Sequence, residues 1–298
     1  MEKIHLDSCP ICGCGNLKPA CRAVDHFSSK EEFEVDLCPE CGFMMTQDAP
    51  SEEEIGQYYE SPEYISHSNT GRGLVNSLYH LVRSYMLRRK LRLIERESFL
   101  RTGHLLDIGA GTGYFAHHAA KAGWKTEALE KSPAAREFAK RRFGIEMIAE
   151  EEIKTLRDNS FDVVTMWHVM EHVRDLDKLW SELRRILKED GVLIVAVPNT
   201  GSYDFKKYGH EWAALDVPRH LWHFNASVMQ KLSNTRGFKM SDCYAMPFDA
   251  FYISAMSEKN AGHNCSFIRG MWTGLMARLH TMAHKEEASS LIYVFRKK

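Results

Sequence analysis

The chain has 298 residues, of which 44% are apolar and 27% are charged, with a formal net charge of -1. These values fit a globular protein with one large α/β domain plus a small appendage, or with two domains. The near-neutral charge excludes a basic field that would recruit nucleic acid, no run approaches the ~18 apolar residues of a transmembrane segment, and the N-terminus lacks a signal-peptide core. We therefore expect a cytoplasmic protein with no nucleic acid partner.

Six of the eight cysteines precede residue 42. The cytoplasm is reducing, so these cysteines are expected to be ligands or free thiols rather than disulfides. Two knuckles repeat, Cys9-Pro10-Ile11-Cys12-Gly13 and Cys38-Pro39-Glu40-Cys41-Gly42. Two thiolates on each tight turn predict a closed, structural Zn²⁺ site held by Cys9, Cys12, Cys38 and Cys41. Cys14 and Cys21 are either free thiols or, for Cys14, a substitute for one of the four ligands.

The composition divides the chain into three regions. Residues 1–48 predict a small zinc-ribbon-like module, and residues 49–103 a helical linker or cap. Residues 104–298 alternate β-rich runs with helical patterns, which is typical of a mostly parallel α/β sheet. An apolar helical stripe interrupts this pattern at about 249–288. We favour core packing for the stripe; a lid, a dimer contact or an interfacial helix in peripheral contact with a membrane stays open.

The α/β region yields a specific order of elements. Strands are expected at 104–108, 126–129, 147–148, 161–166, 192–197, 237–246 and 291–295. Helices are expected at 114–122 and 133–143, the second with Ser132 as N-cap and Pro133 at its first position. A third helix begins near Leu176, and Asp190-Gly191 predicts its end.

A glycine loop follows the first of these strands. The strand ends at Asp107-Ile108 and runs into Gly109, Gly111 and Gly113 before a helix. Glycines permit a tight turn and a close approach to a ligand, which then sits by the helix N-terminus. The third glycine comes one residue earlier than in the dinucleotide fingerprint, and an acid precedes the first, which favours a cationic, amino-acid-like cofactor. Glu130, 21 residues beyond Gly109, ends the next strand, where ribose hydroxyls are bound in such sheets.

This segment resembles motif I of the class I S-adenosylmethionine-dependent methyltransferases. Ser160-Phe161-Asp162-Val163-Val164 and Glu171-His172-Val173 resemble segments of their ubiquinone-type and sugar C-methyltransferase-like branches. The resemblance implies a Rossmann-like seven-stranded sheet with an antiparallel last strand. It also implies that Glu130 binds ribose, that Glu150 lies near the adenine, and that Trp167 and His168 border the methionine end. A different nucleotide cofactor is the alternative.

Histidines cluster where the methyl acceptor would bind. His168 and His172 flank Glu171 after the strand at 161–166, and His220 follows the strand at 192–197. An acceptor that loses a proton needs a base, and histidine is the usual one near neutral pH. We therefore expect the base among these three histidines. The surrounding segment mixes acids, imidazoles, a guanidinium and indoles, which predicts acceptor contacts from His210, Trp212, Asp216, Arg219 and His223.

Together these features predict a methyltransferase that uses S-adenosylmethionine, with a structural zinc. The acceptor is expected to be an oxygen or carbon atom of a small or carrier-linked metabolite such as a sugar, quinone or lipid-like molecule. Two alternatives stay open. One is an RNA methyltransferase with a zinc module, and the other is a catalytically silent module that binds S-adenosylmethionine or a protein partner.

Overall fold

The computed structural model describes residues 3–59 and 74–298, so part of the predicted cap lies outside the described residues. A six-stranded sheet runs through the larger part of the molecule in the order β5-β4-β6-β7-β10-β9. Its strands are β4 (His104–Ile108), β5 (Lys125–Leu129), β6 (Phe161–Trp167), β7 (Leu187–Pro198), β9 (Phe238–Ala245) and β10 (Ser290–Lys297). β10 is antiparallel to both β7 and β9, which confirms the antiparallel last strand.

The strand predicted at 147–148 is reduced to one residue. Ile148 forms an isolated parallel bridge with Leu129 at the edge of the sheet, beside β5. The chain then turns at once into the 3₁₀ helix η2 (Glu150–Thr155), so too few residues remain extended to form a strand. The strand predicted at 147–148 is therefore placed correctly beside β5, but only Ile148 pairs there.

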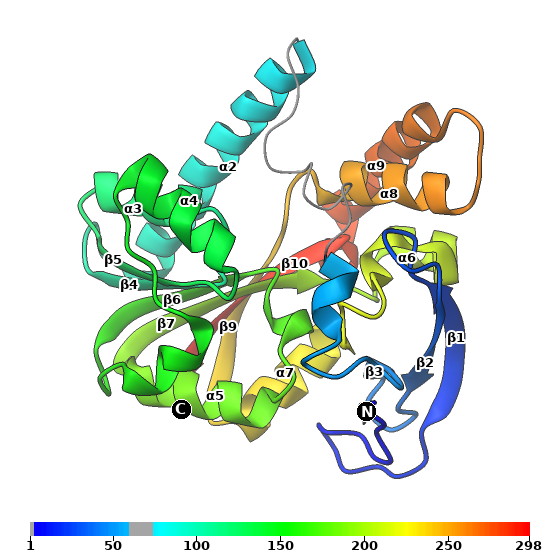
Figure 1. Cartoon of the computed structure of the whole chain (residues 1–298), viewed down its shortest axis with the longest axis horizontal. Helices are drawn as coiled ribbons and strands as arrows, with labels where there is room; N and C mark the ends of the chain where they lie inside the picture. The colour runs from blue at the N-terminus through cyan, green and yellow to red at the C-terminus, as the bar shows by residue number, and fades with distance from the viewer. Residues whose placement is uncertain (1–2, 60–73) are drawn as a thin grey trace.

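Apolar side chains of the strands point alternately to the two faces of the sheet, and helices cover both faces. Leu106, Val164 and Leu193 face one core, which α5 (Leu176–Ile186) and α7 (Ala226–Thr235) cover. Their sequence neighbours face a second core under α2 (Leu74–Ser98) and α3 (Tyr114–Lys121). Figure 1 shows these two helix pairs on opposite sides of the strands, with α4 (Pro133–Phe143) beside α3.

Local capping signals have mixed outcomes. The Ser132 side chain accepts a hydrogen bond from the Ala135 N–H at the start of α4, which confirms the predicted N-cap. The predicted end of α5 at Asp190-Gly191 is wrong, because α5 ends at Ile186. Leu187 already pairs with Phe161 of β6, so the sheet takes up the chain before the helix could continue.

The N-terminal region forms a second sheet of four antiparallel strands. Three are its own, β1 (Lys18–Val24), β2 (Glu32–Leu37) and β3 (Met44–Thr46), and the 3₁₀ helix η1 (Ile55–Tyr59) follows them. The fourth, β8 (Trp222–His223), comes from the α/β region, with Met44 opposite His223 and Met45 opposite Trp222. The division at residues 48 and 103 stays a prediction, but the two regions share a sheet.

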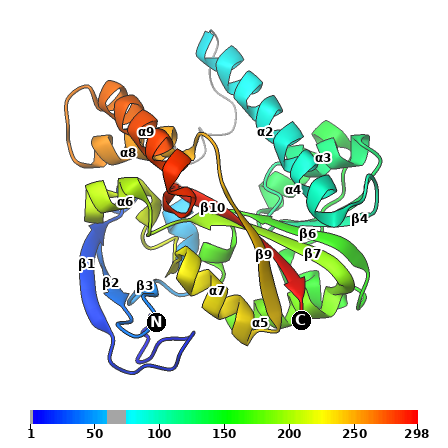
Figure 2. The ribbon, with the colours of Figure 1, turned by 180° about the vertical axis from the view of Figure 1, so that it is seen from behind.

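Two helices occupy the predicted insertion. α8 (Asp249–Asn260) and α9 (Ser266–Ala283) lie side by side in Figures 1 and 2, because Gly270 and Gly274 let α9 approach the backbone of α8. The expectation that the apolar stripe of α9 packs into the core is wrong. Its large side chains lie at the surface, with Phe267 68% and Trp272 65% exposed, since the glycine face of α9 makes the contact instead. Within the described residues, no helix has the length and apolarity needed to cross a membrane.

Short helices complete the connections. α6 (Tyr203–Tyr208) follows β7, and the 3₁₀ helices are η3 (Met170–His172), η4 (Gly209–Glu211), η5 (Ala213–Leu215) and η6 (Lys285–Glu287).

Candidate active site

The glycine loop lies against the loop that follows β6. Gly109 and Gly113 both have positive φ, +67° and +79°, which favours glycine. A Cβ on Gly109 would stand 2.3 Å from the Cγ2 atom of Val169, and one on Gly113 would stand 2.4 Å from the Cε atom of Met147. The loop after β4 is therefore in close contact with Met147 and with Val169, which lies between the predicted catalytic residues His168 and His172.

Two acids border this loop, as the sequence predicts. Asp107 is 1% exposed, and its Oδ1 atom accepts a hydrogen bond of 2.7 Å from the Thr165 hydroxyl. Burial raises the pKa of Asp107 to about 6. The Glu130 carboxylate accepts hydrogen bonds from the N–H groups of Gly111, at 2.7 Å, and Ser132, at 2.8 Å. Both acids therefore border the loop that the sequence predicts to hold the cofactor.

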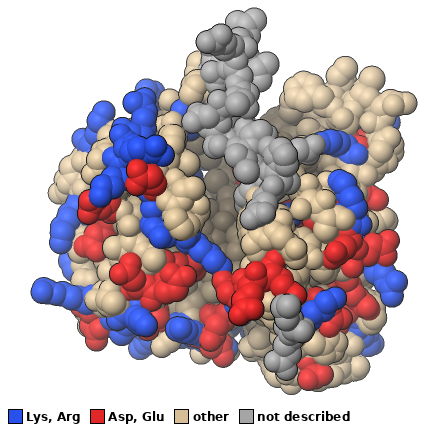
Figure 3. Space-filling model, in the orientation of Figure 1, with Lys and Arg blue, Asp and Glu red and all other residues tan. Residues whose placement is uncertain are grey.

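The other predicted cofactor residues lie at the same end of the sheet. Glu150 begins η2, and burial raises the pKa of its carboxyl beside the charges of Lys131 and Glu130. Trp167 ends β6 and packs edge-to-face on Phe115 with ring centroids 5.6 Å apart. Because β4 pairs in parallel with β5 and β6, the carboxyl ends of these strands lie at one edge of the sheet, the usual ligand position in such sheets. Figure 3 shows the surface hollowed between the α3–α4 side and the α8–α9 side.

His168 is held between two carboxylates. Its Nε2 atom lies 3.2 Å from the Asp249 Oδ2 atom, and its Nδ1 atom 3.4 Å from the Glu171 Oε1 atom. Burial lowers the pKa of His168, but the two carboxylates outweigh it and raise the pKa to about 10. A histidine that is already protonated at neutral pH is a poor proton acceptor. Nothing in the sequence identifies Asp249, which is distant along the chain.

The Nδ1 atoms of His172 and His220 face backbone carbonyl oxygens. Their rings meet edge-to-face with centroids 4.6 Å apart. The Nδ1 atom of His172 lies 3.0 Å from the Arg219 carbonyl oxygen, and that of His220 lies 2.9 Å from the Ala214 carbonyl oxygen. Because a carbonyl only accepts, each ring donates from Nδ1 and keeps a lone pair on Nε2. Burial lowers the pKa of His172 to about 4, so this ring is neutral at pH 7.

Glu171 completes this cluster. It is 0% exposed, its Oε1 atom lies 3.4 Å from the His168 Nδ1 atom, and among the described residues its Oε2 atom has no hydrogen-bond partner. Glu171, His172 and His220 can each supply one atom such that the three atoms lie within 4.8 Å of one another. A buried carboxylate and two imidazoles can accept a proton from a substrate, and the same set suits a divalent transition metal.

Comparison with known proteins identifies the family. The profile of a family described as "Methyltransferase domain" matches residues 80–242, more than half of the chain. The chain belongs to the S-adenosylmethionine-dependent methyltransferases. The prediction of family and enzyme class from motif I is confirmed at this level.

Several named methyltransferases are similar to this chain in sequence. It is 27% identical over 169 residues to a Mycolicibacterium smegmatis protein named "probable S-adenosylmethionine-dependent methyltransferase", covering 55% of this chain and 61% of that one. It is 29% identical to the malonyl-(acyl-carrier protein) O-methyltransferase of Serratia marcescens, covering 39% and 46%. It is 27% identical to the ubiquinone biosynthesis O-methyltransferase of Xanthomonas oryzae, covering 42% and 56%. The chain thus spans about half to three fifths of these relatives.

Solved structures resemble the fold of the methyltransferase. An S-adenosylmethionine-dependent methyltransferase of Archaeoglobus fulgidus superposes with a TM-score of 0.50 at 16% identity, covering 73% of this chain and 94% of that one. This likeness supports the fold alone.

The predicted acceptor residues of the methyltransferase are mostly interior. Trp212 is 2% exposed and donates to the Asp204 carboxylate at 2.7 Å, and His223 is 3% exposed, with its Nε2 atom 3.0 Å from the Thr46 hydroxyl. His210 is exposed and lies 3.3 Å from Glu211. These contacts give Trp212 and His223 a structural role, and acceptor binding by any of the three stays a prediction.

A buried ion network ties the acceptor segment to the N-terminal sheet. The Arg219 guanidinium is fully buried and donates to Asp216 at 2.6 Å, to Asp25 at 2.9 Å and to the Tyr58 carbonyl oxygen at 2.8 Å. Asp216 and Arg219, predicted as acceptor ligands, are therefore partnered with protein groups. Asp25 and Tyr58 were missed because the sequence places them in regions predicted to be separate from the site.

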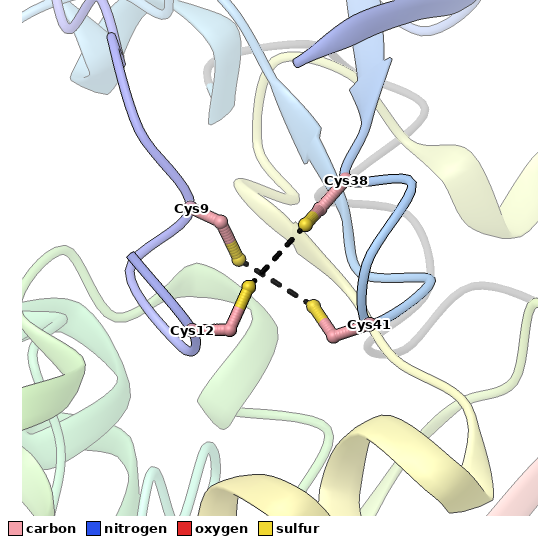
Figure 4. Close-up of side chains that lie close together, drawn as sticks. All are labelled: Cys9, Cys12, Cys38 and Cys41. Atoms are coloured by element: carbon pink, nitrogen blue, oxygen red, sulfur yellow. Dashed lines mark hydrogen bonds between the residues drawn. The ribbon is translucent and has the colours of Figure 1, made fainter. Parts of the chain in front are cut away.

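The four predicted cysteine ligands converge. The Sγ atoms of Cys9 and Cys41 are 3.5 Å apart, those of Cys12 and Cys38 are 3.4 Å apart, and all four lie within 4.8 Å of one another (Figure 4). In each knuckle the glycine N–H, of Gly13 or Gly42, donates to the carbonyl of the first cysteine. Four thiols that face one point from two matched turns fit a tetrahedral Zn²⁺ site. Cys14 and Cys21 lie outside this set, and neither forms a disulfide.

Proposed function

We propose that this chain transfers the methyl group of S-adenosylmethionine to an oxygen or carbon atom of a small or carrier-linked metabolite. The observation that carries the proposal is the cluster of Glu171, His172 and His220 beside the glycine loop. It combines a buried carboxylate, paired through Oε1 with His168, with two imidazoles whose Nδ1 atoms face backbone carbonyl oxygens.

Methyl transfer from a sulfonium is an in-line displacement. The acceptor atom forms a bond to the methyl carbon as the carbon–sulfur bond breaks, so the main task of the protein is to align three atoms. An acceptor hydroxyl or carbon acid also loses a proton, and the Nε2 atom of His172 or His220 is suited to accept it. His168, held as a cation by Asp249 and Glu171, instead balances the charge of these acids.

The relatives support oxygen as the acceptor atom. Two of them are named as O-methyltransferases, one acting on malonyl-(acyl-carrier protein) and one in ubiquinone biosynthesis. Both names describe a small acceptor or one attached to a carrier protein. The net charge of -1 gives no support to an RNA acceptor.

We also propose that Cys9, Cys12, Cys38 and Cys41 hold a structural Zn²⁺ ion. Such a closed site stabilises the N-terminal region and leaves no position for a substrate. The ion would take no part in methyl transfer itself.

The test is transfer of a labelled methyl group from S-adenosylmethionine into fractionated metabolites and acyl-carrier proteins, followed by mass spectrometry of the labelled product. We expect His172→Ala and His220→Ala each to lower turnover, one of them by about 10²–10⁴-fold because it removes the base. Binding of S-adenosylhomocysteine should stay within twofold of the wild type. The control is His5→Ala, an exposed histidine on the N-terminal region.

Two results would overturn this proposal. Cofactor binding without transfer to any fraction would indicate a silent binding module. Labelled RNA in place of a labelled metabolite would indicate the RNA methyltransferase alternative.

A further inference from the structure

Lys90 differs from the other basic residues of its helix. Arg88, Arg89 and Arg92 of α2 are exposed, whereas Lys90 is partly buried on the same face of the helix as Ile94, which is 0% exposed. The Nζ atom of Lys90 lies 4.2 Å from the ring centroid of Trp167 and 5.7 Å from that of Phe115. From the sequence, the basic face of this helix is either solvated or a surface for an anionic substrate or phospholipid, and the structure turns one of its cations inward.

Among residues 3–59 and 74–298, no carboxylate lies within salt-bridge distance of the Lys90 ammonium. In the described part of the chain it makes neither a hydrogen bond nor an ion pair, and its contacts with charged groups are the longer-range ones to Asp107 and Asp249. Burial lowers the pKa of Lys90 to about 8, so it still carries its charge at neutral pH. A buried cation is costly unless an anion pairs with it, and the two aromatic rings compensate only in part.

The proposed cofactor carries an anionic group that could pair with Lys90. The predicted cofactor residues are three acids, three glycines and Trp167, so none of their side chains is positively charged. The methionine part of S-adenosylmethionine carries both an ammonium and a carboxylate. Asp107 suits the ammonium, and His168 is already occupied by two carboxylates. Lys90 lies on Trp167, at the end of the site that the resemblance gives to the methionine part.

We propose that Lys90 binds the α-carboxylate of the cofactor's methionine moiety. This inference rests on the proposed function, because it needs S-adenosylmethionine as the ligand. It assigns to α2 a direct part in cofactor selection, since only a ligand that carries this carboxylate gains the ion pair.

The test compares two ligands that differ in the carboxylate alone. The full chain is titrated by calorimetry with S-adenosylhomocysteine and with its decarboxylated counterpart. Lys90→Met keeps the apolar stem against Trp167 and removes the charge, Lys90→Arg restores the charge, and Arg92→Met is the exposed control on the same helix.

We expect the wild type and Arg92→Met to prefer S-adenosylhomocysteine by about 10–100-fold, the range for a hydrogen bond to a charged group. Lys90→Met should lose this preference while its affinity for the decarboxylated ligand stays within twofold, and Lys90→Arg should regain most of it. An equal loss for both ligands in Lys90→Met, or no loss for either, would overturn the inference while the proposed function stands. A wild type that binds neither ligand would overturn the proposed function first.

Discussion

At the residue scale, neighbours rather than residue type decide the chemistry of the histidines. His168 and His172 are four positions apart, yet carboxylates raise the pKa of His168 to about 10 and burial lowers that of His172 to about 4. The sequence predicts that both lie near the cofactor loop. It could not predict which one accepts a proton, because Asp249 and the Arg219 carbonyl reach them only through the fold.

Asp107 gives the cofactor affinity a dependence on pH. Burial raises its pKa to about 6, so its carboxyl is charged above pH 6 and neutral below it. If it attracts the ammonium of the cofactor, affinity for S-adenosylhomocysteine should fall severalfold between pH 7 and pH 5. Calorimetric titrations across this range should show the fall in the wild type and a much flatter profile in Asp107→Asn. An unchanged profile in Asp107→Asn would assign the titration to another group.

At the scale of elements, hydrophobic periodicity predicts most strands and helices, including β4, β6 and α4. The failures share a cause, which is that tertiary contacts override local signals. Gly191 resembles a helix C-cap, yet pairing with β6 extends β7 back to Leu187. The stripe on α9 resembles a core-facing helix, yet Gly270 and Gly274 provide the closer packing face against α8. An apolar stripe in the sequence does not show whether another face of the helix, lined by small residues, will pack more closely against its neighbour.

The contact between the glycine loop and the loop after β6 can be tested by substitution. Gly109→Ala would place a Cβ atom 2.3 Å from Val169 at a positive φ, so the loop must shift. If the loop binds the cofactor as predicted, affinity for S-adenosylhomocysteine should fall more than about tenfold in titration calorimetry.

Matched variants separate the clash from backbone strain. Gly144→Ala has a similar φ of +70° with no atom within 4 Å of the new Cβ, so its affinity should match the wild type. Val169→Ala combined with Gly109→Ala should recover part of the loss. Equal affinities for Gly109→Ala and the wild type would refute the close contact.

At the scale of the whole molecule, the N-terminal sheet and the α/β region are joined by a shared apolar core and by strand pairing. Cys9 and Cys38 belong to the same apolar core as Val228 and Met229 of α7, and β8 pairs with β3. The Thr46 hydroxyl donates to the His220 carbonyl at 2.7 Å. The sequence predicts the two regions as consecutive modules, because pairing between residues 44 and 223 leaves no trace in local spacing.

This connection predicts that the cysteine site affects turnover. Cys38→Ala, or removal of metal by a chelator, should loosen β3 and displace His220, so turnover should fall about tenfold or more while the Kd for S-adenosylhomocysteine changes little. Steady-state rates and titrations measure the two effects separately. Cys265→Ser, an exposed thiol on α9, is the control. A full rate in metal-free Cys38→Ala would show that the N-terminal sheet positions nothing in the site.

The assignment of S-adenosylmethionine to the glycine loop is tested most directly by measuring which nucleotide the chain binds. Calorimetric titration of the full chain should show one S-adenosylhomocysteine bound per chain, no measurable binding of NAD, and weaker binding in Asp107→Ala and Glu130→Ala. Binding of NAD without binding of S-adenosylhomocysteine would contradict the assignment of S-adenosylmethionine as the cofactor.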